Sequence, residues 1–262
     1  MTSKTVIRKA FETCLAAVEP RQIVRNKISL SPSSIKIGDA KFPLDTSTKI
    51  VLISLGKASI LMAQGAQEIL KAPLLQKTLI LAPEQQRKEG SGEGVFFAAK
   101  NNLPDQNSLS ATDNLIREIQ KLDGPSTIFI FLISGGGSAL LCSPKPPITL
   151  SQKLSVIRRL QSEGADIEQL NIIRQKLSAI KGGKLLRNIR KSGWVSLMIS
   201  DVIGDKVDII ASGPTVIPKE GRKSVKRILE DLRIGEKDLE PKVWELLMEE
   251  EDRTENGNGG LL

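Results

Sequence analysis

The chain has 262 residues, a formal net charge of +8, 40% hydrophobic residues and 26% charged residues, a composition typical of a globular protein with one large domain. It contains no histidine, which excludes a Ser-His-Asp triad, a Cys-His pair and a histidine-ligated metal site. Aromatic residues make up only 3%, so the dispersed basic residues favour small anionic ligands, including phosphorylated ones, over nucleic acid.

The first 20 residues are basic and amphipathic. Val6 and Phe11 belong to an apolar stripe with helical spacing that Pro20 ends, which predicts a helix docked on the body of a cytoplasmic protein. A mitochondrial transit peptide has the same character and is the alternative interpretation. Cys14 lies on this stripe and Cys142 lies in another apolar segment, so both are expected to be reduced core residues. No apolar run in the sequence reaches the length of a membrane-spanning helix.

Residues 29–48 are polar and turn-prone, and beyond them apolar strands alternate with amphipathic helices. The predicted strands are residues 50–55, 77–83, 94–100, 127–133 and 195–200. The predicted helices are residues 58–71, 111–122, 150–161 and 166–186, with weaker helices after residues 220 and 241. Strands that are apolar throughout and alternate with helices indicate an α/β fold with a mostly parallel sheet covered on both faces.

Three of the predicted strands have a serine at or beside their last residue, namely Ser54, Ser134 and Ser200, and a turn follows each of them. Lys57 comes shortly after the first of these strands, a run of three glycines follows the second, and Asp201 follows the third. In open α/β sheets, ligands bind beyond the carboxyl ends of the parallel strands. We therefore expect these three turns to converge on one crevice, although they are far apart in the sequence.

The glycine turn consists of Ser134, Gly135, Gly136, Gly137 and Ser138, and its backbone N–H groups can approach an anion closely. Its sequence is not a Walker A loop, a GxGxxG dinucleotide fingerprint or a GxSxG nucleophile elbow, and no histidine exists to activate Ser138. Three consecutive glycines are costly to order, which favours a phosphate contact. A tight turn in which backbone packs on backbone is the alternative.

Lys57 lies on a strand-to-helix turn, from which its ammonium group could meet a phosphoryl oxygen. An exposed surface lysine is the alternative. Asp201 and Asp205 follow the strand 195–200, and carboxylates at a strand end are natural Mg²⁺ ligands when a phosphate supplies the other oxygens. They could equally cap a helix or pair with Arg174.

A second stripe of polar residues runs along the predicted helix 166–186, beside its buried apolar stripe. It contains Asn171, Arg174, Ser178 and Lys181, and it lacks the alternating acids and bases of a solvated helix face. This pattern indicates a candidate substrate-binding face. An ordinary boundary between the core and the surface is the alternative.

The segments "GKAS", "NNLPD", "LISGGGSALL", "GADIEQLNIIRQKLSAIKGGKLL" and "SDVIGDKVDIIASGPT" occur in an order that resembles the animal branch of the glycerate kinase family. The resemblance implies ATP-dependent phosphorylation of D-glycerate, with Mg²⁺, in the glycolytic, serine and fructose breakdown routes. It implies mainly 2-phosphoglycerate as the product, with 3-phosphoglycerate as the alternative. Lys57 matches the catalytic lysine of the family, and residues 134–138 would face a phosphate or carboxylate of the ligand.

The resemblance covers the chain from the first helix to about Asp238. It implies a Rossmann-like three-layer α/β/α domain over residues 1–240, followed by an acidic, Gly-rich tail over residues 241–262. Family members continue into a second domain, called MOFRL, which carries a second catalytic arginine. The chain is therefore expected to be an N-terminal half. The alternative to a kinase is an inactive truncated isoform that acts as a small-anion-binding or interaction module.

Overall fold

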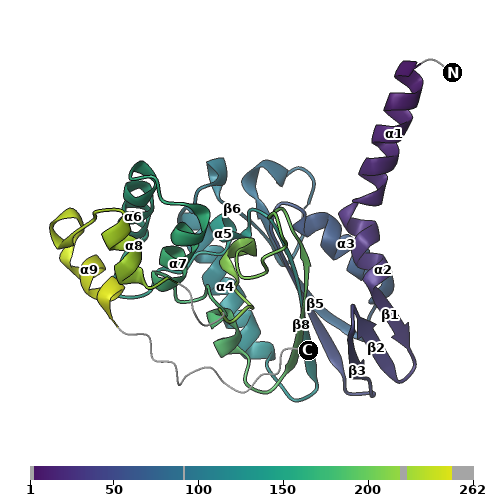
Figure 1. Ribbon diagram of the computed structural model, residues 1–262. Helices are drawn as coiled ribbons and strands as arrows, with labels where there is room; N and C mark the ends of the chain where they lie inside the picture. Colours follow the sequence, from purple (N-terminus) through teal and green to yellow (C-terminus); the bar gives the residue numbers. More distant parts are fainter. Residues whose placement is uncertain (1–2, 91, 219–222, 250–262) are drawn as a thin grey trace.

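The computed structural model describes residues 3–90, 92–218 and 223–249, and at its centre lies a parallel sheet with the strand order β6-β5-β4-β7-β8 (Figure 1). Its strands are β4 (Lys49–Leu55), β5 (Leu75–Pro83), β6 (Val95–Ala98), β7 (Thr127–Ser134) and β8 (Gly193–Ile199). Every neighbouring pair in this sheet is parallel. The central strand β7 is buried at all of its positions, because helices cover both faces of the sheet. The predicted α/β fold with a mostly parallel sheet is confirmed.

Alternate residues of the strands face two separate hydrophobic layers. Val51 and Phe129 belong to the layer that also contains residues of α4 (Gln106–Leu122) and α5 (Gly137–Leu140). Ile50 and Ile130 belong to the opposite layer, with residues of α2 (Pro20–Lys27) and α3 (Ser59–Ile69). This alternation is the two-residue period of a strand, and it produces the three-layer arrangement.

A small antiparallel sheet packs on the second of these layers. It consists of β1 (Ile28–Ser31), β2 (Ser34–Ile37) and β3 (Ala40–Pro43), in that order. Ile35 and Ile37 are buried on one face of β2, whereas Lys36 between them is exposed. The polar, turn-prone sequence of this segment did not predict these strands.

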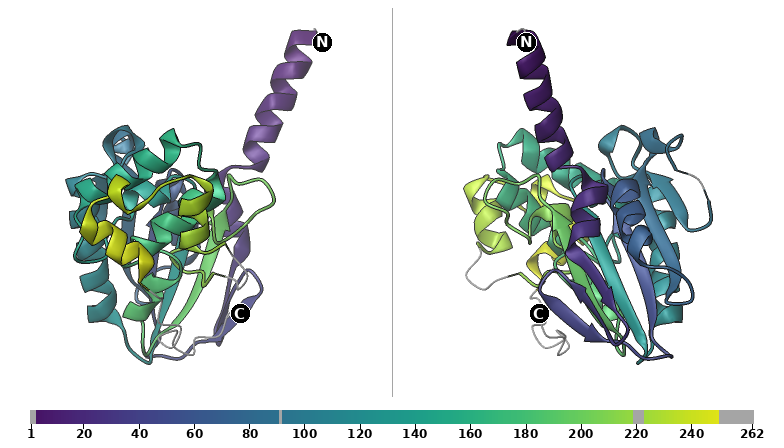
Figure 2. Two further views of the ribbon diagram at one scale, coloured as in Figure 1. Left: turned by 60° about the vertical axis from the view of Figure 1, so that its left-hand side comes forward. Right: turned by 90° about the vertical axis from the view of Figure 1, so that its right-hand side faces the viewer.

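Four helices form a separate group with its own hydrophobic cluster, beside the sheet layers (Figures 1 and 2). They are α6 (Leu150–Ser162), α7 (Ile167–Lys176), α8 (Val225–Asp231) and α9 (Pro241–Met248). Short 3₁₀ turns cover Glu84–Gln86, Lys100–Asn102, Lys184–Asn188, Ile210–Ser212 and Glu236–Asp238. Val243, Leu246 and Leu247 of α9 are buried in this group, so the folded chain continues past residue 240, and residues 250–262 lie outside the described part.

Helix α7 ends ten residues earlier than predicted, at Lys176 rather than residue 186. The backbone after it pairs instead with the segment before α6: the amide of Lys145 donates to the Leu177 carbonyl and that of Ala179 to the Ser143 carbonyl. This pairing joins residues far apart in the sequence, and local periodicity does not report it.

The first helix, α1 (Ser3–Ala17), extends away from the rest of the molecule (Figures 1 and 2). Ile7 and Phe11 on its apolar stripe are 69% and 62% exposed, and Cys14 is exposed as well. The expectations of a docked helix and of a buried Cys14 are therefore wrong for the described residues, whereas Cys142 is buried as expected. Within the described part of the chain, no helix combines the length and the hydropathy that crossing a membrane requires.

Candidate functional site

The turns after β4 and β7 are joined by hydrogen bonds at the carboxyl edge of the sheet. The Lys57 amide donates to the carbonyl of Gly135 at 2.8 Å, and the Ala58 amide donates to Oγ of Ser134 at 3.0 Å. Gly56 has φ = +119°, and a Cβ atom there would lie 2.2 Å from Ser134 Oγ. A side chain would not fit between the two strand ends, so their close approach requires a glycine at position 56.

Each of the three glycines in the turn after β7 leaves room for a different neighbour. A Cβ atom on Gly135 would lie 1.8 Å from Oδ2 of Asp201, and one on Gly136 would lie 2.9 Å from Cγ of Lys57. A Cβ atom on Gly137 would lie 2.6 Å from Cδ1 of Leu55. The glycines therefore allow β4, β7 and the segment after β8 to meet, and the expected convergence of Lys57, Gly136 and Asp201 is present.

The two candidate metal ligands differ in their placement. The Asp201 carboxylate is exposed and covers Gly135, whereas Asp205 lies in an exposed turn with φ = +49°. Among the described residues, no hydrogen bond or ion pair joins Asp205 to the glycine turn, and no group of three or more acidic or thiol side chains could hold a metal ion. Asp201 alone of the pair borders the turn.

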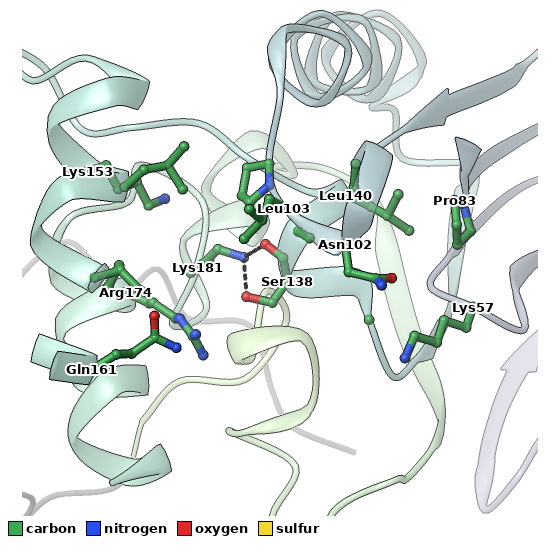
Figure 3. Close-up of a pocket in the computed structure, with 16 residues that line it drawn as sticks. Lys57, Pro83, Asn102, Leu103, Ser138, Leu140, Lys153, Gln161, Arg174 and Lys181 are labelled. Carbon is green, nitrogen blue, oxygen red and sulfur yellow. Dashed lines mark hydrogen bonds between the residues drawn. The ribbon is translucent and has the colours of Figure 1, made fainter. Parts of the chain in front are cut away.

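A cavity of about 230 Å³ opens between the strand-end turns and the helices α6 and α7 (Figure 3). Four basic side chains line it, from Lys57, Lys153, Arg174 and Lys181, and no acidic side chain does so among the described residues. Figure 3 shows Lys57 at one side of the cavity, Lys153 and Arg174 at the opposite side, and Lys181 and Ser138 between them. The electrostatic character of this space therefore suits an anion.

Lys181 is 1% exposed and its ammonium group donates to Ser138, at 2.8 Å to the carbonyl and 3.2 Å to Oγ. Burial lowers the pKa of Lys181 well below its ordinary value, and the nearby cations of Lys153 and Arg174 lower it further, against an opposing effect of Cys142. Lys181 therefore ties the turn after α7 to the glycine turn and brings a cation to the centre of the cavity.

Asn171 and Ser178 support the cavity without lining it. Oδ1 of Asn171 accepts a hydrogen bond from the Ser212 hydroxyl at 2.7 Å, and that hydroxyl lies 2.9 Å from Oγ of Ser138. Oγ of Ser178 donates to the Ser143 carbonyl and accepts from the amide of Lys181. The predicted stripe of four residues thus divides: Arg174 and Lys181 line the cavity, while Asn171 and Ser178 hold the backbone around it.

Lys153, which was not among the predicted site residues, is 4% exposed on α6. Among the described residues its ammonium group has no hydrogen-bond partner. Burial lowers the pKa of Lys153; Cys142 opposes this effect and Arg174 adds to it. The available signal was its position three and four residues before Val156 and Ile157, on the buried face of a helix.

The segment 99–104 also lines the cavity and was not assigned a role. Ala99, Asn101 and Asn102 have φ values of +56°, +62° and +58°, which lie in the left-handed region. Asn102, Leu103 and Pro104 form part of the cavity wall beside Lys57 and Ser138. The motif "NNLPD" marked this segment, but its letters alone did not show where it lies.

The fold and the site define an α/β protein with a strongly cationic cavity at the carboxyl ends of its parallel strands. The chain belongs to the family described as a domain of unknown function (DUF4147), which matches residues 6–248. The relationship to the glycerate kinase family that the motifs predicted is confirmed.

Named relatives support this assignment. A glycerate kinase of Rattus norvegicus is 38% identical over 223 residues, which are 80% of this chain and 42% of that protein. An uncharacterized protein of Caenorhabditis elegans is 53% identical over 254 residues, which are 94% of this chain and 55% of that protein. The chain thus spans about half the length of the curated relatives it matches.

Two solved structures share the fold. The PH0495 protein of Pyrococcus horikoshii aligns with a TM-score of 0.81 and 30% identity, and the glycerate kinase of Thermotoga maritima aligns with a TM-score of 0.76 and 24% identity. Each alignment covers 94% of this chain and 55% of the other. The likeness extends over nearly all of this chain.

Proposed function

We propose that this chain takes part in the ATP-dependent phosphorylation of D-glycerate, with 2-phosphoglycerate as the preferred product and 3-phosphoglycerate as the minor one. The observation that carries this proposal is the cavity itself, in which Lys57 and the glycine turn face three further cations. Relatives named glycerate kinase agree with it. The product would feed glycolysis, and the reaction would serve serine and fructose breakdown in the cytoplasm.

The proposed reaction needs positioning and charge neutralisation more than covalent catalysis. The substrate hydroxyl attacks the γ-phosphorus of ATP, the bond from that phosphorus to the bridging oxygen of ADP breaks, and the hydroxyl proton passes to water. Lys57, held against Gly136, neutralises charge that develops on the transferred phosphoryl group. The absence of histidine is no obstacle, because phosphoryl transfer depends mainly on positioning and electrostatics and water can accept the hydroxyl proton.

Mg²⁺ fits this site as a partner of the phosphates. Asp201 borders the glycine turn and would supply one carboxylate ligand, with phosphate oxygens and water as the others. When bound, Mg²⁺ would neutralise phosphate charge next to Lys57. Asp205, in contrast, has no described contact with the turn, and we assign it no ligand role.

A small-anion-binding module without turnover is the second candidate. The distribution of charge favours it: among the described residues that line the cavity, three cations lie at its centre and far side, and one, Lys57, lies at the strand-end side. More cationic side chains are thus placed to bind an anion than to assist phosphoryl transfer.

Equilibrium dialysis of the purified chain against D-glycerate and against Mg²⁺-ATP, followed by a coupled kinase assay, separates these candidates. Binding with turnover supports the kinase. Binding of glycerate without turnover supports the binding module. Absence of binding to either ligand contradicts both proposals.

A further inference from the structure

Lys153 is a buried lysine, 4% exposed, for which the described part of the protein supplies no hydrogen-bond acceptor. Figure 3 shows its side chain directed toward the cavity, on the same side as Arg174. A buried ammonium group without a partner destabilises a folded protein, so a ligand that supplies the acceptor would account for it.

Arg174 is a half-buried cation beside Lys153 in the same cavity. Its side chain lines the cavity from α7, and no ion pair joins it to any of the described acidic residues. Lys181, by comparison, already donates two hydrogen bonds to Ser138. Among the described residues, Lys153 and Arg174 are therefore the buried or half-buried cavity cations that have no acceptor within the protein.

The positions of the cations give the cavity two poles. Lys57 lies at the strand-end pole, where it covers Gly136. Lys153 and Arg174 form the pole on the helices α6 and α7, opposite Lys57 (Figure 3). A ligand that reaches both poles needs a negative group at each end. A phosphorylated hydroxy acid has this form, since it carries a phosphoryl group and a carboxylate.

We propose that Lys153 and Arg174 bind the carboxylate group of the substrate at the helical pole, so that its hydroxyl faces Lys57 and the strand-end turns. This inference rests on the proposed function, which places phosphoryl transfer at the Lys57 pole. The planar fork of Arg174 suits a carboxylate, and the ammonium group of Lys153 adds a second charged donor. Lys153 thus joins the substrate-binding residues.

The test compares the full chain carrying Lys153→Met with a matched control, Arg158→Met. Arg158 lies on the same helix α6 and is exposed, so both substitutions remove one cation from one helix. Thermal unfolding is measured with and without D-glycerate, glycerol or inorganic phosphate as the added probe. Isothermal titration gives the Kd for D-glycerate.

In the absence of ligand we expect K153M to unfold at a higher temperature than wild type, because the substitution removes an unpaired buried charge. D-glycerate should stabilise wild type and R158M, whereas glycerol, which lacks the carboxylate, should not. The Kd of K153M for D-glycerate should rise about 10- to 100-fold, the effect of losing a hydrogen bond to a charged group.

Several results would overturn the inference: an unchanged Kd in K153M, a lower unfolding temperature of K153M without ligand, or no binding of D-glycerate to wild type. Stabilisation of wild type by phosphate but not by D-glycerate, with the phosphate effect lost in K153M, would assign this pole to a phosphoryl group instead. Different results would refute the proposed kinase activity and the proposed carboxylate site. Glycerate binding that depends on Lys153 without turnover refutes only the kinase, whereas turnover with an unchanged KM for glycerate in K153M refutes only this inference.

Discussion

The alkyl chain of Lys57 lies directly over Gly136, where a Cβ atom would come within 2.9 Å of Cγ and 3.1 Å of Cε of the lysine. The two residues belong to turns that are about 80 positions apart in the sequence, and the backbone hydrogen bond from Lys57 to Gly135 fixes them together. The glycine thus determines where the lysine side chain can lie.

Gly136→Ala should therefore impair the site beyond its effect on stability. Ala at φ = +81° costs about 1–2 kcal/mol, and its methyl group displaces the Lys57 side chain. We expect a loss of about 100-fold in kcat, the effect of a small misplacement of a reacting group. Gly164→Ala is the matched control, because Gly164 has φ = +82° with open space around it. It should lose similar stability and keep its activity, and equal losses of activity in both variants would refute the account.

Lys57→Met should lower kcat by about 100- to 1,000-fold, because it removes the cation nearest to the transferred phosphoryl group. Its unfolding temperature should stay close to that of wild type, since the Lys57 side chain is exposed. Lys71→Met, at another exposed lysine, is the control. Full activity of K57M in a coupled assay would remove this lysine from the mechanism.

The buried lysine at the centre of the cavity should make stability rise with pH. The pKa of Lys181 is far below its ordinary value of 10.5 because of burial, so between the two values the unfolded chain binds more protons than the folded one. The free energy of unfolding should therefore increase from neutral pH toward pH 10, by at most about 1.4 kcal/mol per pH unit for one lysine.

Denaturant titrations at several pH values test this dependence. Lys181→Met should reduce the slope, whereas Lys71→Met should leave it unchanged. Lys77 and Lys206 do not produce it, because their hydrogen bonds to Glu118 and Glu168 raise their pKa values, and they lose protons only above the ordinary range. A wild-type stability that is flat or falls over this interval would contradict the lowered pKa of Lys181 in the folded protein.

Asp201→Asn should raise the Mg²⁺ concentration needed for half-maximal activity by about 10-fold, because it removes the carboxylate that covers Gly135. Asp205→Asn should have no such effect, since Asp205 lies apart from the turn. Activity measured as a function of Mg²⁺ concentration distinguishes the two variants. The reverse order of effects would show that the wrong aspartate was assigned.

The exposed face of α1 leads to a prediction about stability. Ile7→Ser combined with Phe11→Ser should change the free energy of unfolding by less than about 0.5 kcal/mol, because both side chains are exposed. Phe129→Ala in the core should cost about 3–5 kcal/mol. Urea titration of both variants checks the contrast, and a large loss in the α1 variant would mean that its apolar face is buried in solution.

The sheet and the convergence of its turns could be predicted from the sequence because both follow from local patterns. Apolar strands such as β7 must be covered on both faces, and parallel strands place their carboxyl ends at one edge. Lys57, Gly136 and Asp201 followed from that geometry alone.

The remaining features depend on contacts between distant segments. The end of α7 is set by pairing with residues 143–145, and the apolar stripe of α1 shows only that this face suits burial, without a partner among the described residues. Lys153 was missed because a lysine within an apolar stripe was not considered as a candidate. A cation on the buried face of a helix is the signal to examine in such sequences.

The central claim is that the strand-end turns and the helices α6 and α7 form one substrate-binding cavity. A crystal structure of the chain with D-glycerate bound tests it most directly. The account predicts the ligand in the cavity, its carboxylate within hydrogen-bonding distance of Lys153 and Arg174 and its hydroxyl groups toward Lys57. Glycerate bound elsewhere, or with its carboxylate at Lys57, would contradict it.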